Sequence, residues 1–557
     1  MDTDERREHV IVNDPGALEA LYEAHRNDIW VGFNSRHYDQ YILKGILCGF
    51  EAKKISDFII LRGNPGWKFS SLLRQFPLNN YDVMNNTDRG LKAFEGFMGS
   101  DIRESSVPFD IARKLTDAEL AETVQYCRHD VEQTMQVFLR RKEDFEAHLG
   151  LVKLCCQGGP LNLSLISKTK AQLSATLLGA VKRPHDDEFD IDFPPTLRVE
   201  KYTRVLDWYS DPANRRYTDD RGKKIQLEIM VAGVPHQFGW GGVHGALEKY
   251  SGEGFYLNMD VASLYPSLMI RYNLHSRNIP DPSKFVEVYN TRLRYKAEKN
   301  PLQAPLKIVL NSTYGVMKDE NNPLYDPLQA NRVCVYGQLL ILDLIERLEG
   351  RCQVIQSNTD GVLVKLRDGS DAAYEEIDDI CWEWEKRTGL RLEFDEYRRV
   401  YQKDVNNYII VDAAGHYKSK GAYVKKLGPL DYDLPIVNRA LVEYMVHGVP
   451  VERTILSCGE LKEFQLVAKI SGKYAGIRHG EKRLNEKCVR VFASTDPGAG
   501  GVTKLSLRTG KPEKIANSPE RCFIRNDAVN GVPAPPELDR QWYIDLAYKR
   551  LKDFGVI

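Results

Sequence analysis

The 557-residue sequence lacks any apolar run long enough to span a bilayer, and its first residues lack the pattern of a secretory signal peptide. It has ten cysteines but no Cys-x-x-Cys pair and no regular cysteine framework, since only Cys155 and Cys156 are adjacent. Internal repeats and low-complexity tracts are also absent. These absences disfavour a membrane protein, a zinc site and a disulfide-stabilised secreted domain. We therefore predict reduced thiols, a cytoplasmic location and no membrane partner.

The sequence also lacks an excess of positive charge, because 77 lysines and arginines balance 78 aspartates and glutamates to a net charge of −1. Nucleic-acid binding needs local rather than global positive potential. Residues 465–490 supply such a region, with seven lysines and arginines against Glu481 and Glu486, which leaves a net charge of +5. This stretch either follows a phosphate backbone or forms the solvated face of a helix, and the sequence favours neither interpretation.

The length, with 42% hydrophobic and 28% charged residues, predicts a soluble globular protein of about two to four domains. Strand-like segments at 9–13 and 29–33 alternate with helical segments, which predicts an α/β domain over about 1–180. The segment 183–197 is acidic and carries prolines, and we interpret it as a linker to a second body.

Helix-start signals mark the first domain. Asp14 followed by Pro15 predicts an N-cap and a first helical residue. A second helix is expected over 39–49. Thr116 with Glu119 three residues later forms a capping box, which predicts a helix from Thr116 to about Arg141.

Two distant segments of the second body each place a carboxylate at the end of an apolar, strand-like run. Asp260 follows the strand 256–259, and Asp360 lies in the turn of a predicted β-hairpin formed by 353–357 and 361–366. Between them we expect a charged helix over 284–300, a break at Pro301, a helix to about Tyr314 and another over 334–348. Two converging carboxylates can hold two divalent cations and clamp the attacking and leaving oxygens of a phosphoryl transfer.

The order and spacing of three segments, 260–267 (DVASLYPS), 307–315 (KIVLNSTYG) and 357–361 (SNTDG), resembles motifs A, B and C of family B DNA polymerases, in a bacteriophage or prophage type. The resemblance implies an α/β and α+β multidomain fold, with an RNase H-like exonuclease domain followed by a right-hand polymerase of palm, fingers and thumb. It implies a DNA-directed DNA polymerase that adds dNTPs to a primer 3′-hydroxyl. The expected cofactor is a pair of Mg²⁺ ions, for which Mn²⁺ can substitute, and the expected partners are primer–template DNA, dNTPs and phage replisome proteins.

The resemblance also assigns roles to residues at matching positions. The metal ligands are Asp260, the carbonyl of Val261, and Asp360, and the two aspartates are the catalytic pair. The expected nucleotide-binding residues are Ser263, Leu264, Tyr265, Arg292, Lys296, Lys307 and Asn311. The expected DNA-binding residues are Gly241, Gly242, Tyr314, Gly315, Thr359, Tyr408 and Lys420. Tyr265 is expected to lie under the sugar and exclude a 2′-hydroxyl.

Motif C departs from the family pattern, which is usually Asp-Thr-Asp, because this chain has Asn358-Thr359-Asp360. Asn358 keeps oxygen donors but loses a charge, so we expect weakened or altered metal use. A catalytically inactive DNA-binding relic is the first alternative function. The preserved carboxylates Asp260 and Asp360 speak against it, because a binding module does not need both.

Two amino-terminal segments resemble exonuclease motifs of the same family. Asn34 and Asp39 match motif II, and Tyr126 and Asp130 match motif III. Motif I, an Asp-x-Glu on a strand, should precede them, and the carboxylates of 1–5 lack a surrounding strand. We therefore expect the exonuclease to be absent or very weak. The second alternative function is a 3′–5′ exonuclease whose true start lies upstream.

The resemblance divides the chain into six segments. These are an exonuclease-like domain without motif I (1–182), a linker and template-contacting segment (183–250), palm with motif A (251–283), fingers with motif B (284–318), palm with motif C and the primer contact (319–430), and thumb (431–557). In a phage-encoded protein the cytoplasm would be that of the host.

Overall fold

The structure is a computed structural model that describes residues 7–85, 87, 89–108, 111 and 113–557. The amino-terminal carboxylates of 1–5 lie outside the described residues. Within the part of the chain that is described, no helix is both long and apolar enough to cross a membrane.

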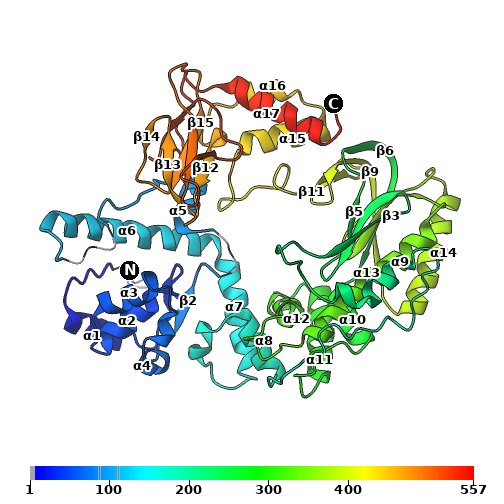
Figure 1. The fold of residues 1–557 in the computed structure, drawn as a ribbon, viewed down its shortest axis with the longest axis horizontal. Helices are drawn as coiled ribbons and strands as arrows, with labels where there is room; N and C mark the ends of the chain where they lie inside the picture. Colours follow the sequence, from blue (N-terminus) through cyan, green and yellow to red (C-terminus); the bar gives the residue numbers. More distant parts are fainter. Residues whose placement is uncertain (1–6, 86, 88, 109–110, 112) are drawn as a thin grey trace. The chain divides into compact units, whose positions relative to one another are not determined.

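The chain forms two compact units, which we describe separately (Figure 1). Unit 1 comprises Met1–Thr169, Leu427–Ile436 and Leu456–Tyr543, and unit 2 comprises Lys170–Lys426, Val437–Ile455 and Ile544–Ile557. Three helices have residues in both: α15 (Pro435–His447), α16 (Val451–Leu456) and α17 (Arg540–Asp553). This division is coarser than the six predicted segments, whose boundaries therefore stay predictions.

The first part of unit 1 is mainly helical. Its helices are α1 (Pro15–Ala24), α2 (Asp39–Leu47), α3 (Ala52–Ile60), α4 (Ser71–Gln75), α5 (Leu91–Met98), α6 (Asp117–Arg140) and α7 (Lys142–Cys155). The start signals of α1 and α6 are confirmed, since Asp14 accepts a hydrogen bond from the amide of Ala17 and the Thr116–Glu119 capping box is complete.

The strands predicted for this region are only partly correct. Strand β1 (Trp30–Gly32) forms and pairs in parallel with β2 (Asn80–Asp82), but Val31 is exposed because the two-stranded sheet leaves one face open. The segment 9–13 is not a strand. Its valines are exposed, and Asn13 turns the chain with a left-handed φ of 52°, so the apolar alternation has no buried face to fill.

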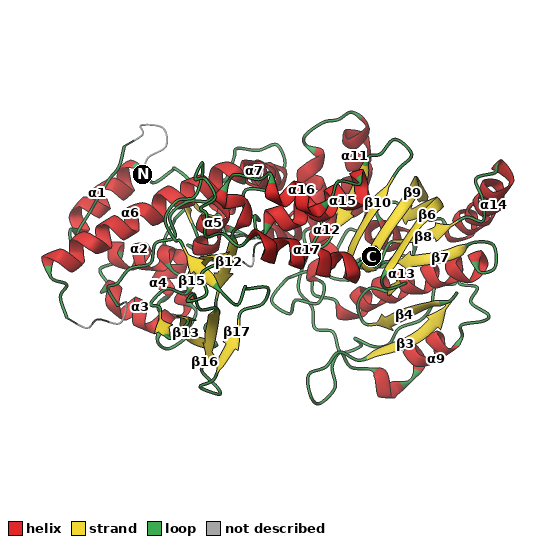
Figure 2. Cartoon of the chain, turned by 90° about the horizontal axis from the view of Figure 1, so that it is seen from above, coloured by secondary structure: helices red, strands yellow, loops and turns green. Residues whose placement is uncertain are grey.

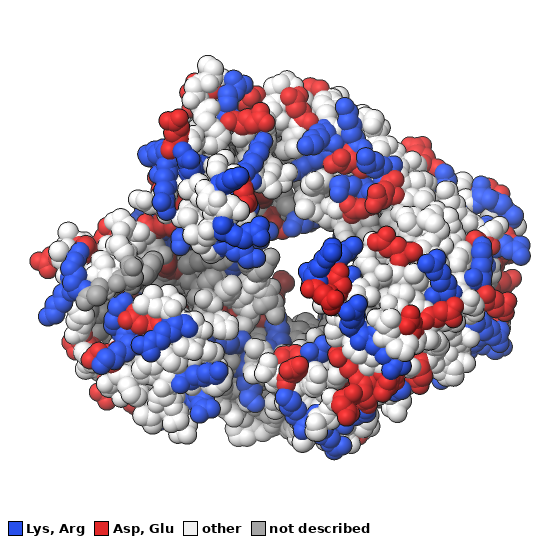
Figure 3. All heavy atoms as spheres, viewed as in Figure 1, with Lys and Arg blue, Asp and Glu red and all other residues white. Residues whose placement is uncertain are grey.

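The second part of unit 1 consists of two small antiparallel sheets. One has the order β12-β15-β18 and the other β14-β13-β16-β17. Their strands are β12 (Leu466–Lys469), β13 (Tyr474–His479), β14 (Lys482–Arg483), β15 (Cys488–Ala493), β16 (Val502–Ser506), β17 (Pro512–Lys514) and β18 (Cys522–Ile524). The basic stretch 465–490 is therefore β-structure and not a helical face. Basic side chains gather over β13 and β14 (Figure 3).

Arg490 is an exception within this basic stretch, because it is fully buried and cannot meet a phosphate. Its guanidinium donates to the carbonyl oxygens of Gly96, Ser100 and Asp527 and to the side chain of Gln465, at 2.8–3.1 Å. These bonds fasten β15 to the end of α5, two segments almost 400 residues apart in the sequence. The arginine stabilises unit 1 and contributes nothing to an external charged surface.

Unit 2 is built on a nine-stranded antiparallel sheet of order β11-β10-β9-β6-β8-β7-β5-β4-β3 (Figure 2). Its strands are β3 (Gln226–Val231), β4 (Val234–Gly239), β5 (His244–Ala246), β6 (Tyr250–Val261), β7 (Gln353–Ser357), β8 (Gly361–Lys365), β9 (Leu392–Asp404), β10 (Asn407–Val411) and β11 (Tyr417–Lys420). The predicted strand before Asp260 and the predicted hairpin around Asp360 are confirmed as the central strands β6, β7 and β8.

The helices of unit 2 are α8 (Lys170–Leu178), α9 (Arg204–Ser210), α10 (Leu264–Arg271), α11 (Ser283–Ala297), α12 (Gln303–Val316), α13 (Pro327–Leu348) and α14 (Asp371–Thr388). Helices α11, α12 and α13 correspond to the three predicted between Asp260 and Asp360, whereas α9, α10 and α14 were not predicted. The break at Pro301 between α11 and α12 is confirmed. Helix α13 starts seven residues before the expected 334, because Asp326 caps it and Pro327 takes its first position. Nearly all of α13 is buried, as expected for a helix in the core.

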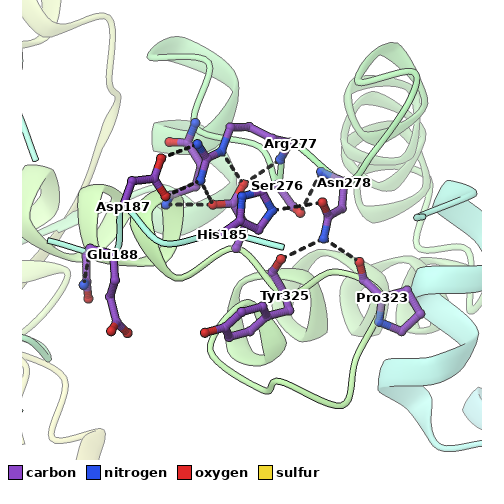
Figure 4. A network of polar contacts seen from close by, with 11 residues as sticks. His185, Asp187, Glu188, Ser276, Arg277, Asn278, Pro323 and Tyr325 are labelled. Carbon is purple, nitrogen blue, oxygen red and sulfur yellow. Dashed lines mark hydrogen bonds and ion pairs between the residues drawn. The ribbon is translucent and has the colours of Figure 1, made fainter. Parts of the chain in front are cut away.

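The segment 183–197 is irregular, as expected of a linker, but polar contacts attach it to unit 2 (Figure 4). The guanidinium of Arg277 bridges Asp187, at 2.6 Å, and the fully buried Asp326, at 2.7 Å. Asn278 donates to the carbonyl oxygens of Pro323 and Tyr325, at 2.9 and 2.7 Å. A single arginine therefore connects the linker to the residue that caps α13.

Replacing Arg277 with methionine should lower the free energy of unfolding by about 3 kcal/mol, because it leaves the buried charge of Asp326 without its partner. Thermal and chemical denaturation would measure the change. Arg351→Met is the matched control, since Arg351 is exposed and its pairing with Glu376 should contribute less than about 1 kcal/mol. Equal losses in the two variants would contradict this account of the linker.

Candidate functional site

The two predicted catalytic carboxylates of unit 2 lie at the ends of neighbouring strands. Asp260 is near the end of β6, and Asp360 is in the turn between β7 and β8. In the β6–β8 register Asp260 is opposite Gly361, and the amide of Val261 donates to the carbonyl oxygen of Asp360 at 2.6 Å. Backbone pairing therefore brings together segments that are 100 residues apart in the sequence.

A glycine makes the approach of the two segments possible. A Cβ atom at Gly361 would lie 2.0 Å from Oδ1 of Asp260 and 2.8 Å from the carbonyl oxygen of Met259. Any side chain at 361 would displace the Asp260 carboxylate. No role was predicted for this glycine from the sequence.

The electrostatics of the pair fit a site for cations. Burial, and then the neighbouring Asp360, raise the pKa of the Asp260 carboxyl to about 6, while a 2.7 Å hydrogen bond from Asn258 acts in the opposite direction. Within the described ranges no group of three or more His, Cys, Asp or Glu side chains is placed to hold a metal ion. The donor set that remains is two carboxylates and backbone carbonyls, which are the hard oxygen ligands that suit Mg²⁺.

Asn358 shapes the turn that carries Asp360. Its side-chain oxygen accepts hydrogen bonds from the amides of Asp360, at 3.2 Å, and Gly361, at 2.9 Å. This is an Asx-type turn, in which an aspartate oxygen could accept the same two bonds. The substitution in motif C therefore changes the charge of the turn without demanding a different backbone.

Motif A continues from Asp260 into a tight turn. Ser263 has a left-handed φ of 51°, a conformation that costs a non-glycine residue on the order of 1 kcal/mol, and α10 begins at the next residue, Leu264. Arg292 reaches this turn from α11 and donates to the Ser263 hydroxyl at 3.1 Å. Two of the predicted nucleotide-binding residues are therefore in direct contact.

Tyr265 lies between motifs B and C. Its ring stacks on that of Tyr314 with centroids 4.0 Å apart and an angle of 25° between the planes. Burial raises the pKa of the Tyr265 hydroxyl, and the nearby hydroxyls of Tyr314 and Thr359 act in the opposite direction. One predicted nucleotide-binding residue thus joins two predicted DNA-binding residues.

The other predicted nucleotide contacts lie on the two helices that follow motif A. Lys296 on α11 forms a long, solvent-exposed ion pair of 3.9 Å with Glu393. Lys307 and Asn311 are exposed on α12, one turn apart. A Cβ atom at Gly315 would meet nothing within 4 Å, so packing does not explain that glycine. These side chains are accessible, and their joint contact with a triphosphate stays a prediction.

The remaining predicted DNA contacts border the carboxylates on two sides. A Cβ atom at Gly242 would lie 2.3 Å from the Thr359 hydroxyl, whereas one at Gly241 would be unhindered. Tyr408 on β10 is paired with Lys420 on β11. Burial, followed by Asp260, raises the pKa of Tyr408, which places this tyrosine near the carboxylate.

Two residues of the site, Asn258 and Asp395, were not predicted from the sequence. Asn258 and Asp395 are side by side on β6 and β9, and Lys418 of β11 pairs with Asp395 at 2.8 Å. Period-two spacing places Asn258 on the same strand face as Asp260, and this signal could have identified it. The contribution of β9 could not have been identified in this way, because it depends on sheet order.

The exonuclease-like residues of unit 1 form a separate cluster. Tyr126 and Asp130 are one turn apart on α6, and burial, followed by Asp130, raises the pKa of the Tyr126 hydroxyl. Burial raises the pKa of Asp39, the first residue of α2, and smaller contributions from Asp82 and Asp130 place the three carboxyls near one another. The amide of Asn34 donates to Asp82 at 2.8 Å.

A lysine occupies part of this cluster. The Lys92 ammonium lies 2.6 Å from Asp130 and 2.9 Å from the fully buried Glu95, and 4.7 Å from the centre of the Tyr126 ring. An internal cation therefore already neutralises the Asp130 carboxylate, which in the predicted role would bind a metal. Neither Lys92 nor Asp82 was identified from the sequence.

Comparison with known proteins gives partial matches. No family model matches the chain. It is 25% identical over 304 residues to a protein named DNA polymerase 1 from Saccharolobus solfataricus, covering 45% of this chain and 33% of that protein. It is 28% identical over 198 residues to DNA polymerase 1 from Sulfurisphaera ohwakuensis, covering 35% and 21%. The matches thus span a third or less of these relatives.

Among solved structures, the chain is similar to the family B DNA polymerase from the archaeon Pyrobaculum calidifontis. The match has 15% identity and a TM-score of 0.42, and it covers 99% of this chain and 73% of that chain. At this TM-score the likeness is too weak to support a conclusion by itself.

Without divalent ions, Asp260→Asn should stabilise the protein at pH 8 by on the order of 1 kcal/mol, because the folded state raises the pKa of this carboxyl to about 6. The gain should be full above pH 6, shrink as the pH falls through 6, and vanish below about pH 4, where the carboxyl is protonated in both states. Thermal denaturation across this pH range would measure it, with the exposed Asp379→Asn as control. A gain that is independent of pH would contradict the raised pKa of Asp260, and with it the burial and the neighbouring charge that cause it.

Proposed function

We propose that this chain is a DNA-directed DNA polymerase that resembles family B enzymes and adds dNTPs to a primer 3′-hydroxyl. The observation that carries the proposal is the approach of Asp260 and Asp360, which are held by the Val261 backbone bond and by the absence of a side chain at Gly361. The partial matches to proteins named DNA polymerase 1 support the same class of reaction.

Different residues of the chain would have different roles in phosphoryl transfer. Asp260, Asp360 and the carbonyl of Val261 would hold two Mg²⁺ ions, or Mn²⁺ in their place. When bound, such ions neutralise developing charge and activate the attacking hydroxyl. Positioning and charge neutralisation are the main requirements of this reaction.

The incoming nucleotide would be bound beside the motif A turn. Arg292, Lys296 and Lys307 carry the positive charge for a triphosphate, and the first of them already contacts this turn through Ser263. The amides at Leu264 and the exposed side chain of Asn311 are further candidate contacts. Tyr265 would pack under the sugar, since its ring is fixed against that of Tyr314.

The duplex would be bound by the predicted DNA contacts around the carboxylates. Gly242 and Thr359 are packed together, and Tyr408 and Lys420 are paired on β10 and β11. Gly241 and Gly315 have open space at their Cα atoms, which would allow a phosphate or a base to approach the backbone closely.

From the sequence motifs alone we further propose a phage-type member that acts in phage DNA replication, in the host cytoplasm and with replisome partners. We do not assign 3′–5′ exonuclease activity to unit 1. The Lys92 ammonium on Asp130 supports this choice, because a divalent ion would have to displace it.

Asp360→Ala should abolish extension of a labelled primer–template in both Mg²⁺ and Mn²⁺, because it removes half of the carboxylate pair. Gel-based extension with all four dNTPs measures this, and Asp379→Ala, an exposed aspartate of α14, is the matched control that should extend like the wild type. A wild-type protein that binds the duplex but extends it in neither metal would contradict the proposal and favour a non-catalytic DNA-binding protein.

Asn358→Asp should preserve or raise Mg²⁺-supported extension severalfold, because an aspartate oxygen can accept the same two amide hydrogen bonds and adds a charge beside the cations. The dependence of the extension rate on Mg²⁺ concentration measures the effect. A large loss of extension with an unchanged melting temperature would show that the amide group of Asn358 has a role of its own.

A further inference from the structure

A histidine reaches the motif C hairpin across an intervening strand. His236 on β4 is directly opposite Gly245 on β5, and Gly245 is directly opposite Ser357 on β7. The His236 ring crosses this middle strand, and its Nε2 lies 2.7 Å from the Ser357 hydroxyl. The contact therefore joins two strands that are not neighbours in the sheet.

Gly245 is the residue that allows this crossing. A Cβ atom at this position would lie 2.4–2.5 Å from three atoms of the His236 ring. No side chain can occupy 245 while the ring stays in place. Gly245 belongs to the glycine-rich segment 239–245, part of the segment 183–250 that was expected to contact template, and it has a packing role there.

The neighbouring carbonyl of Val234 decides which atom donates in the hydrogen bond between His236 and Ser357, called here the His236–Ser357 bridge. Nδ1 of His236 lies 2.9 Å from the carbonyl oxygen of Val234, which can only accept, so Nδ1 carries the hydrogen. Nε2 must then accept from the Ser357 hydroxyl. Burial lowers the pKa of His236 to about 4, so the ring is neutral near pH 7. His236 and Ser357 are 1% and 0% exposed.

The bridge ends one residue before the motif C turn, because Ser357 immediately precedes Asn358, Thr359 and Asp360. A second close approach from the same glycine-rich segment meets this turn, where Gly242 leaves room for the Thr359 side chain. A buried serine and histidine pair is a costly choice for simple packing, since two apolar side chains of similar shape would serve as well. Unlike an apolar pair, the hydrogen bond to His236 fixes the orientation of the Ser357 side chain.

We propose that His236 is a positioning residue for Asp360, which acts by holding Ser357 and thereby the start of the motif C turn. This inference rests on the proposed polymerase function. Residues behind metal-binding side chains commonly change metal affinity or activity by about 10–100-fold when they are replaced.

His236→Phe keeps a ring of similar size but leaves the Ser357 hydroxyl without an acceptor. The matched control is His275→Phe in the same unit, because His275 is also buried and its two ring nitrogens have no hydrogen-bond partner among the described residues. Two quantities would be measured: the Mg²⁺ concentration for half-maximal primer extension, and the dissociation constant for Mn²⁺ from an electron paramagnetic resonance titration without DNA.

We expect His236→Phe to raise both quantities about tenfold, and His275→Phe to leave both unchanged. His236→Gln should recover part of the loss, because its side-chain oxygen can accept from Ser357. Should His236→Phe fail to fold in thermal denaturation, Ser357→Ala removes the other partner with little loss of volume and should shift both quantities in the same direction.

Wild-type Mn²⁺ affinity and Mg²⁺ dependence in folded His236→Phe and Ser357→Ala would overturn the positioning role. If the wild type extends no primer, and the His236→Phe variant binds Mn²⁺ more weakly than the wild type, the proposed function is refuted and the positioning role is retained. A wild type that neither extends a primer nor binds Mn²⁺ would overturn both.

Discussion

The candidate site depends on holding two negative charges side by side in a partly buried position. Asp260 and Asp360 repel each other, and this repulsion adds to burial, the larger cause, in raising the pKa of Asp260. The backbone overcomes it through the central pairing of β6 with β8 and through the bond from Val261 to Asp360. Such an arrangement is unfavourable in isolation and becomes favourable when cations are bound.

Close backbone approaches at glycines allow this arrangement. Gly361 leaves room for the Asp260 carboxylate, Gly242 for Thr359, and Gly245 for the His236 ring. Each lies where a strand or turn of the nine-stranded sheet meets motif C. The motif C hairpin is therefore held on one side by β6 and on the other by the segment before β6 that contains Gly242 and Gly245. A side chain at any of these three glycines would displace the hairpin.

Local signals in the sequence predicted many of the elements but not their assembly. Asp14 with Pro15, the Thr116 capping box and the hairpin around Asp360 are local patterns, and each is confirmed. The early start of α13 at Pro327 could have been predicted too, since Asp326 and Pro327 repeat the signal that starts α1. The sheet order could not, because it brings β9 beside β6 after 130 residues of intervening chain.

The errors share a physical cause, which is that burial is decided by distant segments. Arg490 looks in the sequence like one more surface cation, but carbonyl oxygens from the end of α5 surround it. The alternating pattern of 9–13 resembles a strand, yet no buried face receives its valines. His236 carries no local signal at all, since its role depends on which strands lie beside it.

The most direct test of the account is anomalous diffraction from crystals of the protein with primer–template, an incoming dNTP and Mn²⁺. The account predicts two anomalous peaks between the carboxylates of Asp260 and Asp360, with ligand distances of about 2.0–2.3 Å. An ordered ternary complex with no peak in contact with both carboxylates would contradict it.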